Sequence, residues 1–187
     1  MKYNQVIIGI DPGTNNMGIG IIGVANKTPS LIAMDLLKTE KIDDQAVKLK
    51  KIFDTILRTI DHFHPDEFAI ESQFYGKNVQ SMLKLGRAQG VAIAAALYRD
   101  IPIFEYSPRK IKQSITGRGN ASKEQVSAML VRMLKMDKMP DYLDITDAIA
   151  VAACHYFQKN SQKTSSNNQY SSWKAFISNN PDKIKGK

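Results

Sequence analysis

The sequence predicts an α/β fold built on one five-stranded mixed sheet with helices on both faces. Three observations support this prediction. The chain has 187 residues, a length that fits one domain with a short appendage. Its first third contains three strand-like stretches separated by short turns, as in an antiparallel meander. Beyond them, helical patterns alternate with short apolar strands, which is typical of parallel strands connected by covering helices.

The first strand is expected over residues 5–11, because QVIIGID is almost continuously apolar and β-branched. This composition is typical of a strand that is covered on both faces. A turn over residues 12–16 follows it. The remaining expected strands are, in chain order, 17–24, 31–39, 67–71 and 101–106.

Helices are expected where apolar residues recur at spacings of three and four. The second helix carries Gly86 and Gly90 on its apolar stripe, and two glycines leave a stripe smooth enough for another backbone to approach closely. We expect this stripe to pack on the sheet or on a second copy of the chain, with Gly86 and Gly90 as candidate dimer contacts. Ser122 followed by Gln125 has the pattern of a capping box. The expected helices are, in chain order, 43–63, 78–99, 108–115, 122–136 and 144–157.

Positive charge is concentrated in two segments of the chain. The whole chain has a net charge of +8, of which residues 107–138 contribute +6 and the last 28 residues +4, while residues 35–67 carry −2. One basic segment alone is usually a solvated helix face, but two in the same half favour a phosphate-backbone partner. Residues 160–172 are low in complexity, so we expect a domain over 1–159 and a flexible basic tail over 160–187.

Cysteine content and hydropathy indicate the cellular compartment in which the protein is expected. A single cysteine, Cys154, forbids an intrachain disulfide and is compatible with a reducing cytosol. The longest apolar stretch, residues 91–98, is much shorter than the ~20 residues that a membrane helix needs. Neither basic segment has the aromatic face of a helix that lies on a membrane surface. We therefore expect a cytoplasmic protein with no membrane partner.

Four carboxylates stand in unusual places. Asp11 and Glu71 each end an apolar strand, and the ends of parallel neighbouring strands are where open α/β sheets bind ligands. Asp144 and Asp147 lie three residues apart on one face of the last helix. Two carboxylates ~4 Å apart repel by about 4 kcal/mol at an effective dielectric of about 20, so four of them need cations or protons. Hard oxygen ligands suit Mg²⁺, or Mn²⁺ in its place.

Each carboxylate also has a structural interpretation. Asp144 and Asp147 are able to cap a helix and to complement its dipole. Asp11 is also compatible with a turn residue before a Pro-Gly pair. Glu71 is hardest to explain structurally, because its strand has no polar alternation that would expose it. The joint pattern is more specific than any one member.

Three other patterns point elsewhere. Residues 18–23 spell G-x-G-x-x-G, but these glycines lie inside an expected strand rather than between a strand and a helix, which disfavours a dinucleotide site. The strand and Asp-x-Gly-Thr turn at the N-terminus are also typical of actin-like and sugar-kinase ATPases, whose fold duplicates a unit that occurs once here. His155 lies eleven residues after Asp144, on the same helix face, and we favour a packed or partly solvated histidine over a site residue.

Four stretches of the sequence resemble a known protein family. Four stretches, in family order and within residues 5 to about 158, resemble the RuvC family of bacterial Holliday-junction resolvases. They are GIDPGTNNMGIGII at 9–22, AIESQFYGKNVQSMLKLGRAQGVA at 69–92, EYSPRKIKQSITGRGNASKEQV at 105–126 and DITDAIAVAACH at 144–155. The resemblance implies an RNase H-like fold, a homodimer and two Mg²⁺ ions per active site. It also implies paired, symmetric nicks in opposing strands of a four-way DNA junction, and a branch-migration partner of the RuvA and RuvB type.

The resemblance also implies roles for individual residues. By motif position, the metal ligands correspond to Asp11, Glu71, Asp144 and Asp147. Of these, Asp11 is the expected bridging ligand between two ions, which activate water and stabilise the departing 3′ oxygen.

Five further residues are expected to meet DNA. Phe74 corresponds to an aromatic that stacks on junction bases, and such stacking contributes ~1 to 3 kcal/mol per base. Lys112 and Lys123 match lysines near the scissile phosphate, where a fixed positive charge stabilises the transition state, and Lys112 is the candidate catalytic lysine. Tyr75 and Arg118 are our additions, from adjacency and charge. The alternatives are another RNase H-like nuclease that cuts flaps or RNA–DNA hybrids as a monomer, and a non-catalytic junction-binding protein.

Overall fold

The computed structural model describes residues 2–72, 78–138 and 140–165, and side chains as far as residue 160. The chain forms two compact units, residues 1–156 and 157–187. Every site residue discussed below that the structure describes belongs to the first unit. None of the described helices is both long enough and apolar enough to cross a bilayer.

The first unit is built on a five-stranded sheet with the order β3-β2-β1-β4-β5. The pairs β1–β2 and β2–β3 are antiparallel, whereas β1–β4 and β4–β5 are parallel. The expected meander and mixed sheet are therefore confirmed. The strands are β1 (Gln5–Asp11), β2 (Asn16–Ala25), β3 (Thr28–Lys38), β4 (Glu67–Glu71) and β5 (Ile103–Tyr106).

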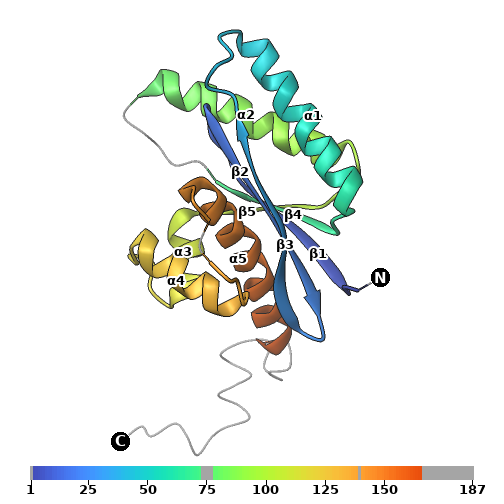
Figure 1. Cartoon of the computed structure of the whole chain (residues 1–187), viewed down its shortest axis with the longest axis vertical. Helices are drawn as coiled ribbons and strands as arrows, with labels where there is room; N and C mark the ends of the chain where they lie inside the picture. The colour runs from blue at the N-terminus through green and yellow to red at the C-terminus, as the bar shows by residue number, and fades with distance from the viewer. Residues whose placement is uncertain (1, 73–77, 139, 166–187) are drawn as a thin grey trace, which may run out of the picture. The chain divides into compact units, whose positions relative to one another are not determined.

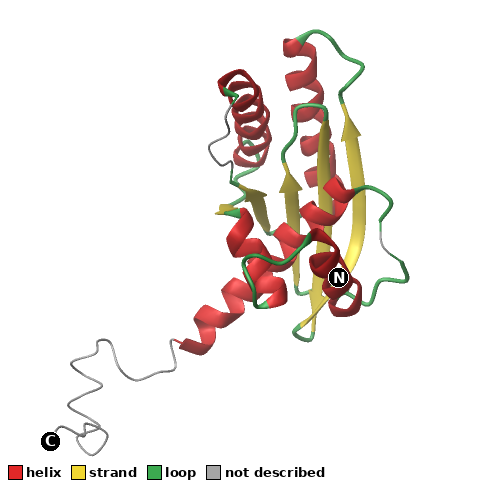
Figure 2. Cartoon of the chain, turned by 90° about the vertical axis from the view of Figure 1, so that its left-hand side faces the viewer, coloured by secondary structure: helices red, strands yellow, loops and turns green. Residues whose placement is uncertain are grey.

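Helices cover both faces of the sheet, as expected. In Figure 1, α1 and α2 lie together on one side of the strands and α3, α4 and the first part of α5 on the other; Figure 2 shows the same layers after a quarter turn. The helices are α1 (Gln45–Phe63), α2 (Val79–Leu97), α3 (Pro108–Thr116), α4 (Lys123–Met133) and α5 (Leu143–Ser165).

The alternation of side chains along the central strands decides which face each residue serves. Ile8 and Ile10 of β1 belong to the core under α1 and α2, as do Phe68 and Ile70 of β4. Because successive strand residues point to opposite faces, the intervening positions point toward α5. Asp11 and Glu71 fall on that second face, which explains how a carboxylate ends each apolar strand.

Glycines on β1 and β2 let α5 lie directly on the sheet. A Cβ atom added at Gly9 would lie 2.3 Å from the Ala148 carbonyl oxygen, and one at Gly18 would lie 1.9 Å from the Asp144 carbonyl oxygen. Contacts this close leave room for no side chain at either position. The G-x-G-x-x-G pattern lies within β2, as predicted, and its first glycine, Gly18, allows α5 to pack directly on the strand.

Element ends follow local chemistry. Ser122 and Gln125 form the predicted capping box at the start of α4. The strand expected from residue 31 begins at Thr28, because Asn26 and Lys27 both adopt positive φ and make a tight hairpin.

The last helix was expected to end near residue 157, and that expectation is wrong. The helix α5 continues to Ser165, so residues 160–165, which we expected to be flexible, are helical. No glycine or proline interrupts them, and glutamine and lysine are good helix formers.

Candidate active site

Two carboxylates meet at the C-terminal ends of adjacent parallel strands. Asp11 and Glu71 each follow directly on the paired residues Ile10 and Ile70 of β1 and β4. Burial, and then the negative charges of Glu71, Asp147 and Asp144, raise the pKa of Asp11 to about 8. Burial and then Asp147 raise the pKa of Glu71 to about 7. The structure thus brings these acids close enough to oppose one another's ionisation.

The helix α5 supplies the other two carboxylates. Asp144 and Asp147 lie near its start, and both are half-buried. The close contact of Gly18 with the Asp144 backbone holds this end of α5 against the sheet beside Asp11, since Asp11 and Gly18 are paired across β1 and β2. All four predicted metal ligands therefore gather from β1, β4 and α5.

Two lysines border the acids. The Lys123 ammonium, at the start of α4, lies 2.5 Å from Asp147 Oδ2. Burial opposes the charge of Lys123, but the bond to Asp147 and the charges of Asp147, Asp11 and Asp144 outweigh it and raise the lysine pKa. Lys112 on α3 lies near enough to Glu71 to lower the pKa of that carboxyl against the stronger effect of burial. A cleft of about 190 Å³ joins both lysines to Glu71 and Asp147.

The acid cluster suits a divalent cation by its chemistry. Its donors are carboxylate oxygens, and the repulsion that raises the pKa values of Asp11 and Glu71 would be relieved by bound positive charge. Over the described ranges, no three acidic, histidine or cysteine side chains stand in a geometry that would hold an ion. Lys123 binds one oxygen of Asp147, Oδ2, and the second oxygen of this carboxylate is also able to act as a ligand.

The predicted DNA-binding residues fall in different places. Lys112 and Lys123 line the cleft. Arg118 is exposed at the end of α3, beside a separate hollow of about 410 Å³ that it shares with Arg132 of α4. Phe74 and Tyr75 lie outside the described residues.

The glycine stripe of α2 does not pack on the sheet. An added Cβ at Gly86 or Gly90 would meet no atom within 4 Å. The side of α2 that packs into the core with α1 and the sheet consists instead of four buried alanines, Ala88, Ala92, Ala95 and Ala96. Of the two packing partners expected for the stripe, the sheet is thus excluded.

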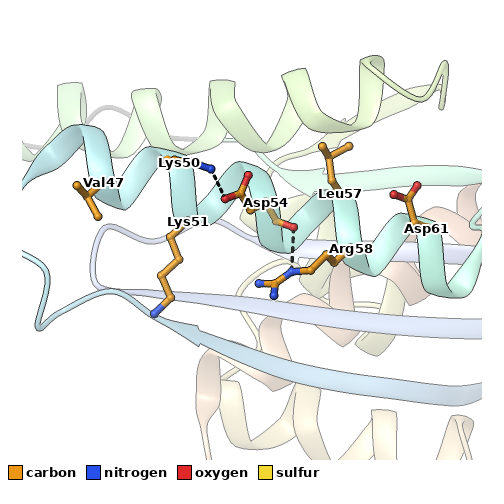
Figure 3. A pocket seen from close by; sticks show the side chains of 7 residues that line it. All are labelled: Val47, Lys50, Lys51, Asp54, Leu57, Arg58 and Asp61. Atoms are coloured by element: carbon orange, nitrogen blue, oxygen red, sulfur yellow. Dashed lines mark hydrogen bonds and ion pairs between the residues drawn. The ribbon is translucent and has the colours of Figure 1, made fainter.

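A larger hollow lies far from these groups. A groove of about 640 Å³ runs along α1, on the opposite side of the sheet from α5 (Figure 1). Figure 3 shows that Asp54 engages two of its cations: Lys50 lies 2.6 Å from Asp54 Oδ2, and Arg58 is bonded to the Asp54 carbonyl oxygen. The other two charged groups have partners beyond the groove, since Lys51 donates to the Lys38 carbonyl oxygen and Asp61 pairs with Arg99. None of its seven lining residues was predicted as a site residue, and we assign it no role.

One buried polar cluster escaped sequence reasoning. His155 is 2% exposed, and its Nε2 lies 2.8 Å from Glu67 Oε2 while its Nδ1 lies 2.7 Å from the Tyr106 hydroxyl. Gln5 Nε2 donates to the same Glu67 oxygen. The preference for a packed His155 is confirmed, but its partners were not foreseen. A signal was present, because Glu67 starts the same apolar strand that Glu71 ends.

Comparisons with known proteins agree with this geometry. The family profile described as crossover junction endodeoxyribonuclease RuvC matches residues 7–155. The protein of that name from Cytophaga hutchinsonii is 55% identical over 182 residues, covering 97% of this chain and 89% of the relative. The one from Christiangramia forsetii is 55% identical over 185 residues, covering 99% and 95%.

A solved structure supports the same assignment. Thermus thermophilus RuvC, in complex with Holliday junction substrate, aligns with a TM-score of 0.81 and 29% identity over 85% of this chain and 97% of that one. The predicted RNase H-like fold is thereby confirmed. On the family profile, the near full-length relatives and this shared fold, the chain belongs to the RuvC family of crossover junction endodeoxyribonucleases.

Proposed function

We propose that this chain resolves four-way DNA junctions by metal-assisted hydrolysis, making paired, symmetric nicks as a homodimer in the cytoplasm. The observation that carries the proposal is the convergence of four carboxylates from β1, β4 and α5 beside two lysines. Each phosphodiester carries a negative charge, and an acid cluster approaches one only when cations neutralise it. Family membership adds the substrate, since the Thermus thermophilus relative was solved with a Holliday junction.

The residues divide the work by position. Asp11, Glu71, Asp144 and Asp147 would hold two Mg²⁺ ions, or Mn²⁺ in their place, and Asp11 is the bridging candidate because the other three carboxylates and Lys123 all act on its pKa. When bound, such a pair of ions lowers the pKa of a water molecule and neutralises charge at the departing 3′ oxygen. Asp147 is also the partner of Lys123, and if this carboxylate turned to an ion, the Lys123 ammonium would be free to bind a phosphate oxygen.

Lys112 supplies a second fixed charge. It lines the same cleft as Lys123, and α3 holds it there through a Ser107 cap at one end and a left-handed Gly117 at the other. A preorganised cation stabilises the negative charge that develops on the phosphate in the transition state. Arg118 would hold a backbone phosphate farther along a junction arm, and Phe74 and Tyr75 are proposed to stack on opened bases.

The exposed stripe of α2 is our candidate for the homodimer contact. Val79 is 68% exposed, Leu83 58% and Leu97 56%, and Gly86 and Gly90 between them leave the helix surface open. A second copy that laid the same stripe antiparallel against this one would bury these side chains in a self-complementary contact. Two active sites would then face a substrate that is itself nearly twofold. A branch-migration complex of the RuvA and RuvB type would deliver that substrate.

The function is tested by cleavage of matched synthetic substrates. A four-way junction, a flap and an RNA–DNA hybrid are incubated with the chain in Mg²⁺ or in chelator, and both strands are labelled. We expect paired nicks in the junction when Mg²⁺ is present and none in chelator. Asp11→Asn should make no nicks but should still bind the junction.

Other outcomes would redirect the assignment. Cutting of the flap or the hybrid instead would identify another RNase H-like nuclease. Binding of the junction without any cutting would identify a junction-binding protein. Loss of binding by Asp11→Asn would make that residue structural.

A further inference from the structure

A chain of buried polar groups ties α5 to three strands of the sheet. Glu67 of β4 accepts from Gln5 of β1 and lies 2.8 Å from His155 of α5, while Tyr106 of β5 lies 2.7 Å from the other ring nitrogen of His155. Phe104 packs against the imidazole with ring centroids 4.3 Å apart. Because burial raises the pKa of Tyr106 to about 12, its hydroxyl keeps its proton and is able to donate to His155.

The centre of this cluster, His155 and Glu67, is shielded from substrate, whereas Tyr106 is half-buried. The His155 side chain is 2% exposed and Glu67 10%, and both imidazole nitrogens already have partners. Buried polar groups of this kind are strongly unfavourable unless they are paired, so their partners hold their places closely. The cluster therefore acts, if it serves the reaction, through the position of the elements that it connects.

The cluster and the candidate acids lie on the same two elements, β4 and α5, at matching distances along each. Glu67 and Glu71 occupy the two ends of β4, and four residues of strand span about 13 Å. His155 follows Asp147 by eight residues of α5, and eight residues of helix span about 12 Å. The helix runs antiparallel to β4. The contact of His155 with Glu67 and the approach of Asp147 to Glu71 therefore form two rungs between helix and strand, and the spacing between these rungs is nearly the same along α5 as along β4.

The neighbouring strand connects the two rungs. Tyr106 is paired in register with Glu71 across β4 and β5, so both side chains point to the same face of the sheet. The Tyr106 hydroxyl nevertheless reaches back to His155 in the other rung. A slip of α5 by one residue, about 1.5 Å, would break the contacts of His155 with Glu67 and Tyr106 together.

We propose that Glu67, His155 and Tyr106 are positioning residues for the hydrolytic reaction: they lock the axial register of α5 on β4, and thereby set the distance between Asp147 and Glu71. The inference rests on the proposed function. Smooth glycine contacts at Gly9 and Gly18 decide how deeply α5 lies on the sheet, but they place no stop against sliding. The polar cluster provides such a stop, beside the hydrogen bond that the Tyr156 hydroxyl donates to the Lys27 carbonyl oxygen.

The test separates positioning from stability. His155→Leu, His155→Gln, Tyr106→Phe and Glu67→Gln are compared with Ile60→Ala, a buried control on α1 across the sheet. Single-turnover junction cleavage at saturating protein, junction Kd in chelator, Tm, and the Tm gain on adding Mg²⁺ without DNA are measured well below every Tm. A displacement of about 1 Å costs a reaction about 100-fold, so we expect His155→Leu to lose about that factor in rate with little change in Kd.

The conservative variants sharpen the result. His155→Gln keeps a donor for Glu67 and should recover most of the lost rate, and Tyr106→Phe should lose less than His155→Leu. The proposal is overturned if Ile60→Ala, at an equal loss of Tm, slows cleavage as much as His155→Leu, if Kd worsens in parallel with rate, or if His155→Gln recovers nothing. If His155→Leu does not fold, Tyr106→Phe and Glu67→Gln decide: lowered rates support the proposal, and wild-type rates from both refute it.

Failure of the underlying function would look different. A wild-type chain that cuts no junction would refute the proposed activity and leave the Mg²⁺-induced Tm gain as the readout. Loss of that gain in His155→Leu, but not in Ile60→Ala, would still support positioning of the acids. An equal gain in both variants would refute it.

Discussion

Because Gly9 and Gly18 let α5 pack directly on the sheet, Gly18→Ala is the most informative single change. The added methyl group would lie 1.9 Å from the Asp144 carbonyl oxygen and 2.6 Å from its carbonyl carbon. Both are backbone atoms, which cannot rotate aside as a side chain can. Ordinary contact begins at about 3.4 Å, so this end of α5 must lift by about 1.5 Å, and Asp144 and Asp147 lift with it.

Two magnitudes follow from that displacement. Forcing an extra methyl group into a packed site costs about 1 to 3 kcal/mol, and the rigid obstacle places this case near about 3 kcal/mol. For a chain of this size that corresponds to a fall in Tm of about 6 to 12 °C. A shift above 1 Å in the acids should slow cleavage by about 100-fold or more, while the exposed DNA-binding residues keep junction affinity close to normal.

The assay pairs Gly18→Ala with a control on the same strand. At Gly23 the three atoms nearest to an added methyl group belong to the side chains of Tyr3 and Ile32, which are able to move where backbone is not, so Gly23→Ala should lose less stability and no cleavage rate. Tm is measured by calorimetry, and the rate by single-turnover cleavage of a synthetic junction at a temperature where both variants are folded. Cleavage by Gly18→Ala within about threefold of wild type would refute the claim that this glycine places the acids.

Four further predictions concern charge and assembly. In chelator, Tm should fall as pH rises from about 4 to 8. Folding raises the pKa values of Asp11 to about 8 and Glu71 to about 7, so the folded chain retains protons there that the unfolded chain has lost. Mg²⁺ binding, followed by calorimetry, should tighten over pH 6 to 8 with release of protons, and an affinity that does not change with pH would contradict this coupling. Lys112→Ala should lower the single-turnover rate by orders of magnitude more than junction affinity, and equal losses in both would assign it to phosphate anchoring. Arg118→Ala should reduce the slope of log affinity against log salt by about 0.9 in filter binding, whereas an unchanged slope would remove it from the interface. Leu83→Lys should give a monomer in analytical ultracentrifugation, with uncoupled single nicks and a Tm that no longer rises with protein concentration, and a persistent dimer would exclude the α2 stripe.

Local pattern was enough for most of the elements. Strand β1 was predicted with its observed bounds, because a run of β-branched residues that ends in Asp-Pro-Gly has few other solutions. The Ser122 capping box located the start of α4 for the same reason. The end of α5 was missed, because residues 160–165 have the polar composition of a linker and yet contain nothing that stops a helix.

The candidate acids were also visible in the linear order. A carboxylate at the end of a strand that is buried on both faces needs a partner, and Glu71 therefore stood out before any contact was known. The same reasoning applies to Glu67, which starts the strand, but a residue at a strand's entry is readily taken for an exposed one. Its partner His155 lies 88 positions away along the chain, and no spacing rule connects residues so distant.

By itself, the order of residues determined most of the elements, the mixed sheet and the choice of candidate acids, because these depend on short-range periodicity and on the high cost of burying charge. Only the tertiary structure decided that the open stripe of α2 faces away from the sheet, that Lys123 holds Asp147, and that Glu67, His155 and Tyr106 form one buried cluster. The physical reason is that these contacts depend on how deeply and in what register a helix packs on a sheet. Depth and register are set jointly by side chains from many parts of the chain, and no local segment contains that information.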